Sequence, residues 1–93
     1  MTGEIRTERT LYSGNVQGVG FRWTTKRIAA GHSVTGFVQN LADGSVELVV
    51  QSPQGEIDRF RTEILEQLKY RIEQHSTQTM SSEEELTTFE IRC

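Results

Sequence analysis

The sequence of 93 residues predicts an α+β fold in which two helices cover one face of a mainly antiparallel sheet. Three observations predict it. A β-rich hairpin occupies residues 34–51, an amphipathic helix follows over residues 56–68, and a strand, glycine loop and helix precede it over residues 7–30. In order these elements read β-α-β-β-α-β with an extra strand at the end, which is the split βαβ, ferredoxin-like arrangement. The length predicts one domain over residues 1–93.

The first part of this order is a strand and a helix joined by a glycine loop. Residues 7–14 contain Leu11 and Tyr12, which favour β structure, and are expected to form the first strand. Residues 21–30 follow the loop with apolar side chains at helical spacing, and Gly31 suits the position just after a helix. This part therefore delivers a helix N-terminus directly behind the glycines.

The middle of the chain is predicted to be a β-hairpin. Residues 34–40 and 45–51 are its strands, and the second is the most β-rich stretch of the sequence. Asp43 and Gly44 make the tight connection, with Gly44 placed for a positive φ. Residues 52–55, Ser-Pro-Gln-Gly, end the second strand.

The second helix, over residues 56–68, carries one continuous apolar stripe with charged side chains around it. The stripe consists of Ile57, Phe60, Ile64, Leu65 and Leu68. A fourth strand is expected over residues 69–75, with Tyr70 and Ile72 facing the core.

The last quarter of the chain is polar. Residues 74–85 lack large apolar side chains and are expected to form a loop. Residues 86–92 are expected to form a closing strand, with Phe89 and Ile91 pointing inward. Cys93 is expected to be a free thiol without a role.

Composition excludes several classes of protein. The net charge of −3 argues against a nucleic-acid binder held by phosphate contacts, and no apolar run is long enough to span a membrane. One cysteine rules out an internal disulfide, and neither His32 nor His75 has the spacing of a metal ligand, so we expect no metal. The polar N-terminus does not resemble a secretory signal, and a cytoplasmic protein is expected.

The stretch most informative about function is the glycine loop, residues 14–22, Gly-Asn-Val-Gln-Gly-Val-Gly-Phe-Arg. It lacks the Lys-Ser/Thr pair of a Walker A loop and the G-x-G-x-x-G spacing. A loop that opens into a helix N-terminus still presents free N–H groups and the positive end of the helix dipole. Arg22 adds a planar fork that fits phosphate or carboxylate oxygens. The alternatives at this point are an anion cradle or a purely structural turn.

Two unbroken motifs resemble the acylphosphatase family. Residues 14–22 match its glycine loop, and residues 36–47, Gly-Phe-Val-Gln-Asn-Leu-Ala-Asp-Gly-Ser-Val-Glu, match its second block. The order and separation of the two motifs also match. The close resemblance covers residues 14–51, and the rest follows only the order of elements and the closing Phe-Glu-Ile of residues 89–91. The chain departs from the family pattern at residues 67–72, which have no glycine or proline, and at Cys93.

The resemblance implies metal-independent hydrolysis of the carboxyl–phosphate bond of acyl phosphates, with no cofactor. It assigns catalysis to Arg22 and Asn40: Arg22 and the loop N–H groups hold the phosphate, and Asn40 positions the attacking water. The substrate-binding residues it implies are Asn15, Val16, Gln17, Gly18, Val19, Gly20, Phe21 and Arg22. Phosphate or sulfate is expected to bind as an inhibitor-like ligand, and the expected protein is a monomer without nucleic-acid or membrane partners. An amide at residue 40 suits the role, because it orients water without titrating.

Two other functions stay open on the sequence. One is a non-catalytic anion-binding or interaction module of the same fold, and the other is a domain of a larger carbamoyl-phosphate-handling enzyme. Individual residues also have alternative roles. Asn40 could simply end a strand before a turn, and Asp43 is expected to stabilise the turn and not to take part in catalysis. Gln17 and Phe21 are expected to have structural roles, in shaping the loop and in packing the core. Trp23 either packs beside the site or lies half exposed.

Overall fold

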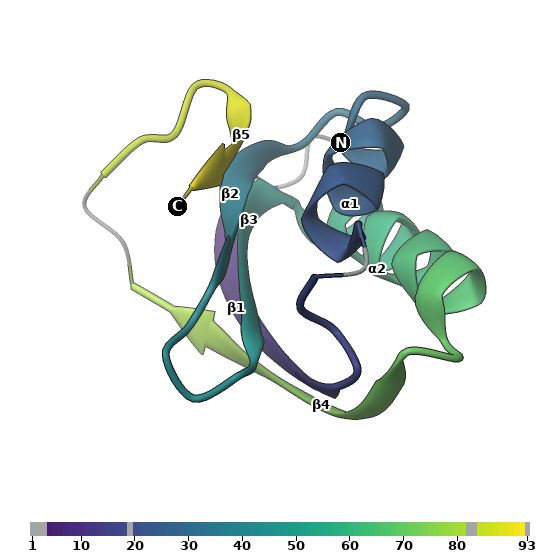
Figure 1. The fold of residues 1–93 in the computed structure, drawn as a ribbon. Coiled ribbons are helices and arrows are strands. Elements are labelled where there is room, and N and C mark those ends of the chain that lie inside the picture. Colours follow the sequence, from purple (N-terminus) through teal and green to yellow (C-terminus); the bar gives the residue numbers. More distant parts are fainter. Residues whose placement is uncertain (1–3, 19, 82–83, 93) are drawn as a thin grey trace.

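The computed structural model describes residues 4–18, 20–81 and 84–92. Its elements follow the predicted order, β-α-β-β-α-β with one further strand (Figure 1). They are β1 (Ile5–Gly14), α1 (Phe21–Ala29), β2 (Thr35–Asn40), β3 (Val46–Pro53), α2 (Gln54–Leu68), β4 (Ile72–Met80) and β5 (Phe89–Arg92).

The strands form a mixed sheet in the order β4-β1-β3-β2-β5. The pairs β1–β3, β1–β4 and β2–β3 are antiparallel, and only the β2–β5 pair is parallel among the described strands. Both helices lie on the same side of the sheet (Figure 1). The ferredoxin-like α+β prediction is therefore confirmed.

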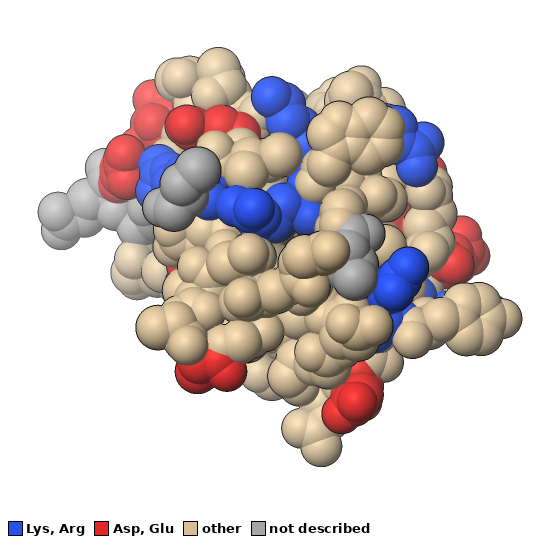
Figure 2. Space-filling view, viewed as in Figure 1, with Lys and Arg blue, Asp and Glu red and all other residues tan. Residues whose placement is uncertain are grey.

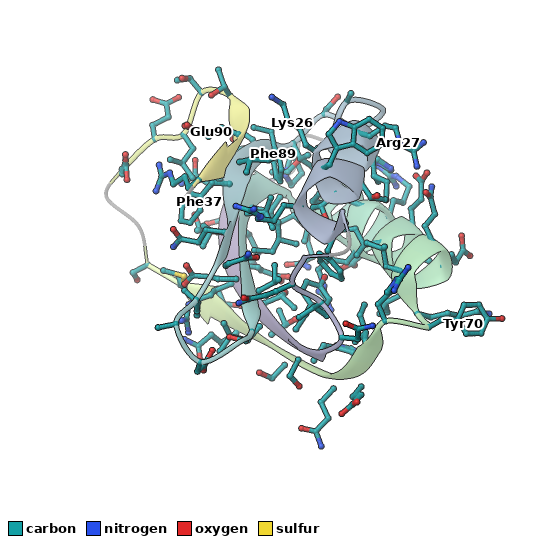
Figure 3. All side chains as sticks on the ribbon, in the orientation of Figure 1. Lys26, Arg27, Phe37, Tyr70, Phe89 and Glu90 are labelled. Carbon is teal, nitrogen blue, oxygen red and sulfur yellow. The ribbon has the colours of Figure 1, made fainter. Side chains whose placement is uncertain are left out.

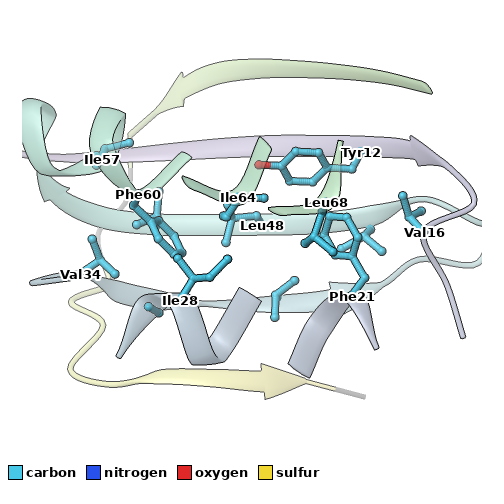
Figure 4. Close-up of a cluster of buried hydrophobic side chains, with 14 residues drawn as sticks. Tyr12, Val16, Phe21, Ile28, Val34, Leu48, Ile57, Phe60, Ile64 and Leu68 are labelled. Atoms are coloured by element: carbon cyan, nitrogen blue, oxygen red, sulfur yellow. The ribbon is translucent and has the colours of Figure 1, made fainter. Parts of the chain in front are cut away.

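The core fills the space between the helices and the sheet (Figure 4). Strand β3 sends alternate side chains into it, and the side chains of Val46, Leu48 and Val50 are fully buried. The predicted stripe of α2 faces the same space, and its members Ile57, Phe60, Ile64 and Leu68 are buried. Each such side chain contributes about 1.5–3 kcal/mol when it leaves water, so this layer fixes α2 on the sheet.

Strand β4 is longer than the sequence predicts. It pairs with β1 from Gly14↔Ile72 to Thr7↔Met80, so residues 76–80, which were expected to be loop, are strand. The physical reason is that β4 is an edge strand, and most of its side chains are exposed. The ladder uses main-chain groups, so an exposed edge strand forms without an apolar pattern.

The prediction that Tyr70 faces the core is wrong. The Tyr70 side chain is 91% exposed and points away from the molecule (Figure 3). Helix α2 ends at Leu68, and a turn follows in which the Arg71 N–H donates to the Leu68 carbonyl at 2.9 Å. Tyr70 lies in this turn, and the strand begins only at Ile72, which packs against the core as expected.

Other boundaries shift by a few residues. Helix α2 begins at Gln54 instead of residue 56, and β5 starts at Phe89 instead of residue 86. Phe89 and Ile91 pack against the core, as the alternation predicts. Among the described residues, no helix has the length and apolar character needed to cross a membrane. The expectation for Cys93 falls on a residue outside the described ranges.

Candidate active site

The loop before α1 turns through two glycines in the left-handed region. Gly18 has φ 75° and Gly20, which precedes the first helical residue, has φ 78°. Side chains disfavour this backbone conformation, and glycine adopts it freely. No side chain caps the start of α1, and its first turn carries no acidic residue. The helix therefore presents its positive end to whatever lies in front of it.

A side-chain clamp fixes the loop to the β2–β3 turn. The Gln17 Nε2 atom donates to the carbonyl oxygens of Leu41 at 2.9 Å and Ser45 at 2.8 Å. At the other end of the loop, the Asn15 N–H donates to the Arg71 carbonyl at 2.9 Å. The loop is thus bound to the turn directly after Asn40, although Gln17 and Leu41 lie 24 positions apart in the chain.

The β2–β3 turn itself is held by Asp43. Its Oδ1 atom accepts hydrogen bonds from the Ser45 hydroxyl at 2.6 Å and the Ser45 N–H at 2.9 Å. These bonds stabilise the carboxylate and lower the pKa of Asp43 below its ordinary value. Asp43 does not line the cavity described next. Its geometry is that of a turn residue.

A small cavity of about 150 Å³ lies where the loop, α1, β2 and β5 meet. Arg22 and Asn40 both line it, although 18 positions separate them in the sequence. The full lining is Val16, Gly18, Gly20, Phe21, Arg22, Trp23, Asn40 and Ile91. Glycine backbone, one cation and one amide thus face the same space.

Arg22 lies in the first turn of α1 and is half-buried. Its Nη1 atom donates to the main-chain carbonyl of Arg92, in β5, at 3.2 Å. A guanidinium carries five N–H donors, so this one bond orients the group and leaves donors for a ligand. Strand β5 therefore helps to aim Arg22.

Asn40 is the last residue of β2, and its partner across the hairpin is Val46. Its Oδ1 atom is buried and has no hydrogen-bond partner in the described part of the chain. A buried acceptor without a partner is costly, and a functional role is one explanation for such an atom. Asn40 therefore brings to the cavity lining a side-chain amide whose oxygen has no partner among the described residues.

The structure gathers most of the residues that the sequence nominates. Those in the cavity lining are Val16, Gly18, Gly20, Phe21, Arg22 and Asn40. Asn15 and Gln17 are not in the lining, because they bind the loop to its surroundings. Val19 lies outside the described residues. The sequence reasoning left Trp23 undecided and missed Ile91 as a site residue, because no local pattern signals that β5 pairs beside β2.

A larger depression of about 490 Å³ lies along α2. Its lining includes the carboxylates of Asp58, Glu63 and Glu66. Figure 2 shows that Lys and Arg side chains cross one face of the molecule in a band at the level of α1 and β5, with Asp and Glu around its edges. The small cavity has Arg22 and no acidic residue in its lining, whereas the larger depression has three carboxylates beside Arg59, so an anionic ligand is favoured at the small cavity.

Comparison with known proteins decides the family. The family model described as Acylphosphatase matches residues 8–91. The chain belongs to the acylphosphatase family. The acylphosphatase of Lactobacillus gasseri is 35% identical over 89 residues, which cover 94% of this chain and 98% of that protein. The acylphosphatase of Pediococcus pentosaceus is 52% identical over 48 residues. That alignment, like the one with the Latilactobacillus sakei protein, spans about half the length of each relative.

Solved acylphosphatase structures share the fold. The acylphosphatase from Bacillus subtilis superposes with a TM-score of 0.83 at 26% identity, covering 97% of this chain and all of that one. The HypF protein of T. kodakarensis superposes equally well at 27% identity. In that case the match covers 95% of this chain and 12% of the HypF chain. The same unit therefore occurs inside a much longer protein.

Proposed function

We propose that this acylphosphatase hydrolyses the carboxyl–phosphate bond of acyl phosphates, releasing a carboxylate and inorganic phosphate without a metal ion. One observation carries the proposal. Arg22 and Asn40 line one cavity at the start of a helix, and the buried Oδ1 atom of Asn40 has no hydrogen-bond partner among the described residues. This arrangement supplies donors for a phosphate and an acceptor for a water molecule.

The phosphate is held by the loop. Main-chain N–H groups within residues 16–22 and the Arg22 guanidinium donate to its oxygens, and the positive end of α1 adds to the attraction. A phosphoryl transition state spreads charge over three equatorial oxygens, which these fixed donors stabilise. Inorganic phosphate or sulfate should occupy the same place as an inhibitor.

The attacking water is held by Asn40. Its amide oxygen accepts a hydrogen bond from one O–H of the water and aims the water oxygen at phosphorus; this proton stays on the attacking oxygen. A new P–O bond forms, the bond from phosphorus to the acyl oxygen breaks, and the carboxylate leaves with the electron pair. The second water proton passes to a phosphate oxygen, so no protein base is required. A carboxylate in place of Asn40 would repel the substrate.

The positive charge in this mechanism comes from the protein. Among residues 4–18, 20–81 and 84–92 there is no group of three His, Cys, Asp or Glu side chains able to hold a metal ion. The positive charge that a metal ion would otherwise supply comes from Arg22 and the N-terminal end of the α1 dipole. A carboxylate is a good leaving group, so its departure needs no strong acid. We further propose a cytoplasmic monomer of one domain that binds neither membrane nor nucleic acid, as composition and the net charge of −3 suggest.

Two rivals use the same fold. A non-catalytic anion-binding module would need the donors of Arg22 but not the free acceptor of Asn40, so Asn40 favours the enzyme. The second rival is a domain of a larger carbamoyl-phosphate-handling enzyme, and the match to 12% of the HypF chain shows that this unit also occurs within a longer protein. That alternative changes the preferred substrate from a carbon-linked acyl group to a carbamoyl group.

The experiment is hydrolysis of benzoyl phosphate and carbamoyl phosphate by the purified protein in excess EDTA. We expect turnover of benzoyl phosphate that survives the chelator, with competitive inhibition by inorganic phosphate. Phosphate binding in calorimetry without turnover of either substrate would establish the binding module instead. Turnover of carbamoyl phosphate alone would favour the larger enzyme, and activity abolished by EDTA would contradict the metal-free mechanism.

A further inference from the structure

Trp23 is an exposed aromatic residue at the mouth of the candidate site. Its side chain is 63% exposed, one of three large hydrophobic side chains in the described residues that are open to solvent. The other two, Ile5 and Tyr70, do not line the cavity, whereas Trp23 does. An apolar surface left in water beside a binding cavity is stabilised when an apolar ligand covers it.

The helix places the indole outside the core. Phe21 points inward and is buried, and Trp23, two residues later, lies roughly 200° further around the helix axis. One turn later on the same side, the Arg27 guanidinium carbon lies 5.5 Å from the centre of the Trp23 ring. The Arg27 Nη2 atom in turn donates to Gln67 Oε1 at 3.0 Å. Arg27 and its bond to α2 thus support the ring from one side.

The cavity is small. Its volume of about 150 Å³ is below the range of about 300–1,000 Å³ found for pockets that enclose drug-sized ligands. If the phosphate lies against the loop and Arg22, it fills much of this volume, and a bulky acyl group has to extend past the remaining lining. Trp23 belongs to this lining, is next in sequence to Arg22, and is open to solvent.

We propose that Trp23 forms the wall of an acyl-binding subsite and selects acyl phosphates whose acyl group is a planar aromatic or an extended apolar group. This inference rests on the proposed function, since it concerns the same cavity. The ring stacks against the acyl group while the phosphate stays on the loop. Trp23 is a specificity-determining residue, and the bond-breaking step does not use it.

The kinetic test compares benzoyl phosphate with acetyl phosphate. We expect Trp23→Ala to lower the ratio of kcat/KM for benzoyl over acetyl phosphate by about fivefold to tenfold, the contribution of one aromatic contact, mainly through KM. Trp23→Phe should keep that ratio within about twofold because it retains a ring. Tyr70→Ala, which removes an exposed aromatic outside the cavity, is the matched control. An unchanged ratio in Trp23→Ala would overturn the subsite.

A binding test on the unmodified protein needs neither turnover nor a variant. Trp23 is the only tryptophan in the sequence, so indole fluorescence reports on this position alone. Benzylphosphonate should change the emission and saturate at a concentration at least fivefold lower than methylphosphonate. Equal concentrations, or no change of emission, would overturn the proposal. An inactive protein that still binds benzylphosphonate more tightly than methylphosphonate would contradict the proposed hydrolysis but support the subsite. An active protein that binds the two phosphonates equally would support the hydrolysis and overturn the subsite.

Discussion

The position of Arg22 predicts an anion nearby, and the fold adds a hydrogen bond that orients its side chain. A cation in the first turn of a helix opposes the helix dipole, which predicts an anion nearby. In the structure the guanidinium lines the cavity and donates to the Arg92 carbonyl at 3.2 Å. The misfit with the dipole is visible in the sequence, whereas the bond to β5 is not. That bond depends on the fold, because 70 positions separate the two residues.

The first prediction concerns the shape of the Arg22 side chain. Arg22→Ala should lower kcat/KM for benzoyl phosphate by about 10³-fold, because the transition state loses its paired donors. Arg22→Lys should recover only part of this loss, since an ammonium group cannot bind two oxygens through a planar fork. The control is Lys26→Ala, which removes a charge from an exposed position of the same helix. Equal rates for Arg22→Lys and the wild type would contradict the prediction.

The second prediction concerns the backbone at Gly20. Gly20→Ala places a side chain at φ 78°, which costs about 1–2 kcal/mol of unfolding free energy even though the space around it is open. Gly31→Ala is the matched control, because Gly31 has no positive φ and the nearest atom to an added Cβ lies at 3.5 Å. Urea unfolding of both variants measures the difference. A Gly20→Ala protein as stable as Gly31→Ala would show that the loop relaxes freely.

At the scale of elements, the spacing of apolar residues predicts the helices and strands that pack against the core. It does not predict elements whose side chains are exposed. The apolar stripe of α2 and the β-rich sequence of β3 are strong signals because most of their side chains are buried. Strand β4 has no such pattern, because it lies at the sheet edge and pairs through its main chain. Tyr70 was misplaced for the related reason that a turn offers no core for it to face.

Helix α2 begins with a charged cluster that the sequence did not predict. His32 lies between two carboxylates, with Nδ1 3.1 Å from Glu56 Oε2 and Nε2 2.8 Å from Glu63 Oε1. Glu56 also accepts hydrogen bonds from the Arg59 side chain and from the Ser33 N–H. The cluster therefore joins the end of α1 to the start of α2.

The third prediction is a pH dependence of stability that arises from Glu56. Hydrogen bonds from Arg59, then from the Ser33 N–H, lower the pKa of Glu56 from 4.5 to about 2. A lowered folded-state pKa gives a contribution that is complete above the unfolded pKa of 4.5 and is lost as the pH falls towards 2.

Thermal unfolding tests this. The Tm difference between wild type and Glu56→Gln should be largest near pH 7 and should shrink between pH 4.5 and pH 2. Glu66→Gln removes a charge from an exposed position of the same helix and is the control. A Tm difference that stays constant over this range would show that the cluster does not hold Glu56 in its charged form.

At the scale of the whole molecule, the site is assembled from three distant parts of the chain (Figure 1). The glycine loop and the β2–β3 turn meet through Gln17, and β5 adds Ile91 and the Arg92 carbonyl. The first two parts carry local motifs, so the sequence predicts Arg22 and Asn40. The third part reaches the site because β5 pairs in parallel with β2. This pairing joins residues distant in the sequence, and no local motif predicts it. One domain over residues 1–93 stays a prediction.

In the proposed mechanism the loop and Arg22 bind the phosphate, and Asn40 positions the attacking water. The most direct test is one measurement on Asn40→Ala, in which kcat for benzoyl phosphate and the inhibition constant of inorganic phosphate are determined together. We predict that kcat falls by about 10²–10³-fold, as when one positioned group is removed from a transition state, while the inhibition constant stays within about threefold. Full activity of this variant, or a loss explained by weaker phosphate binding, would contradict the account.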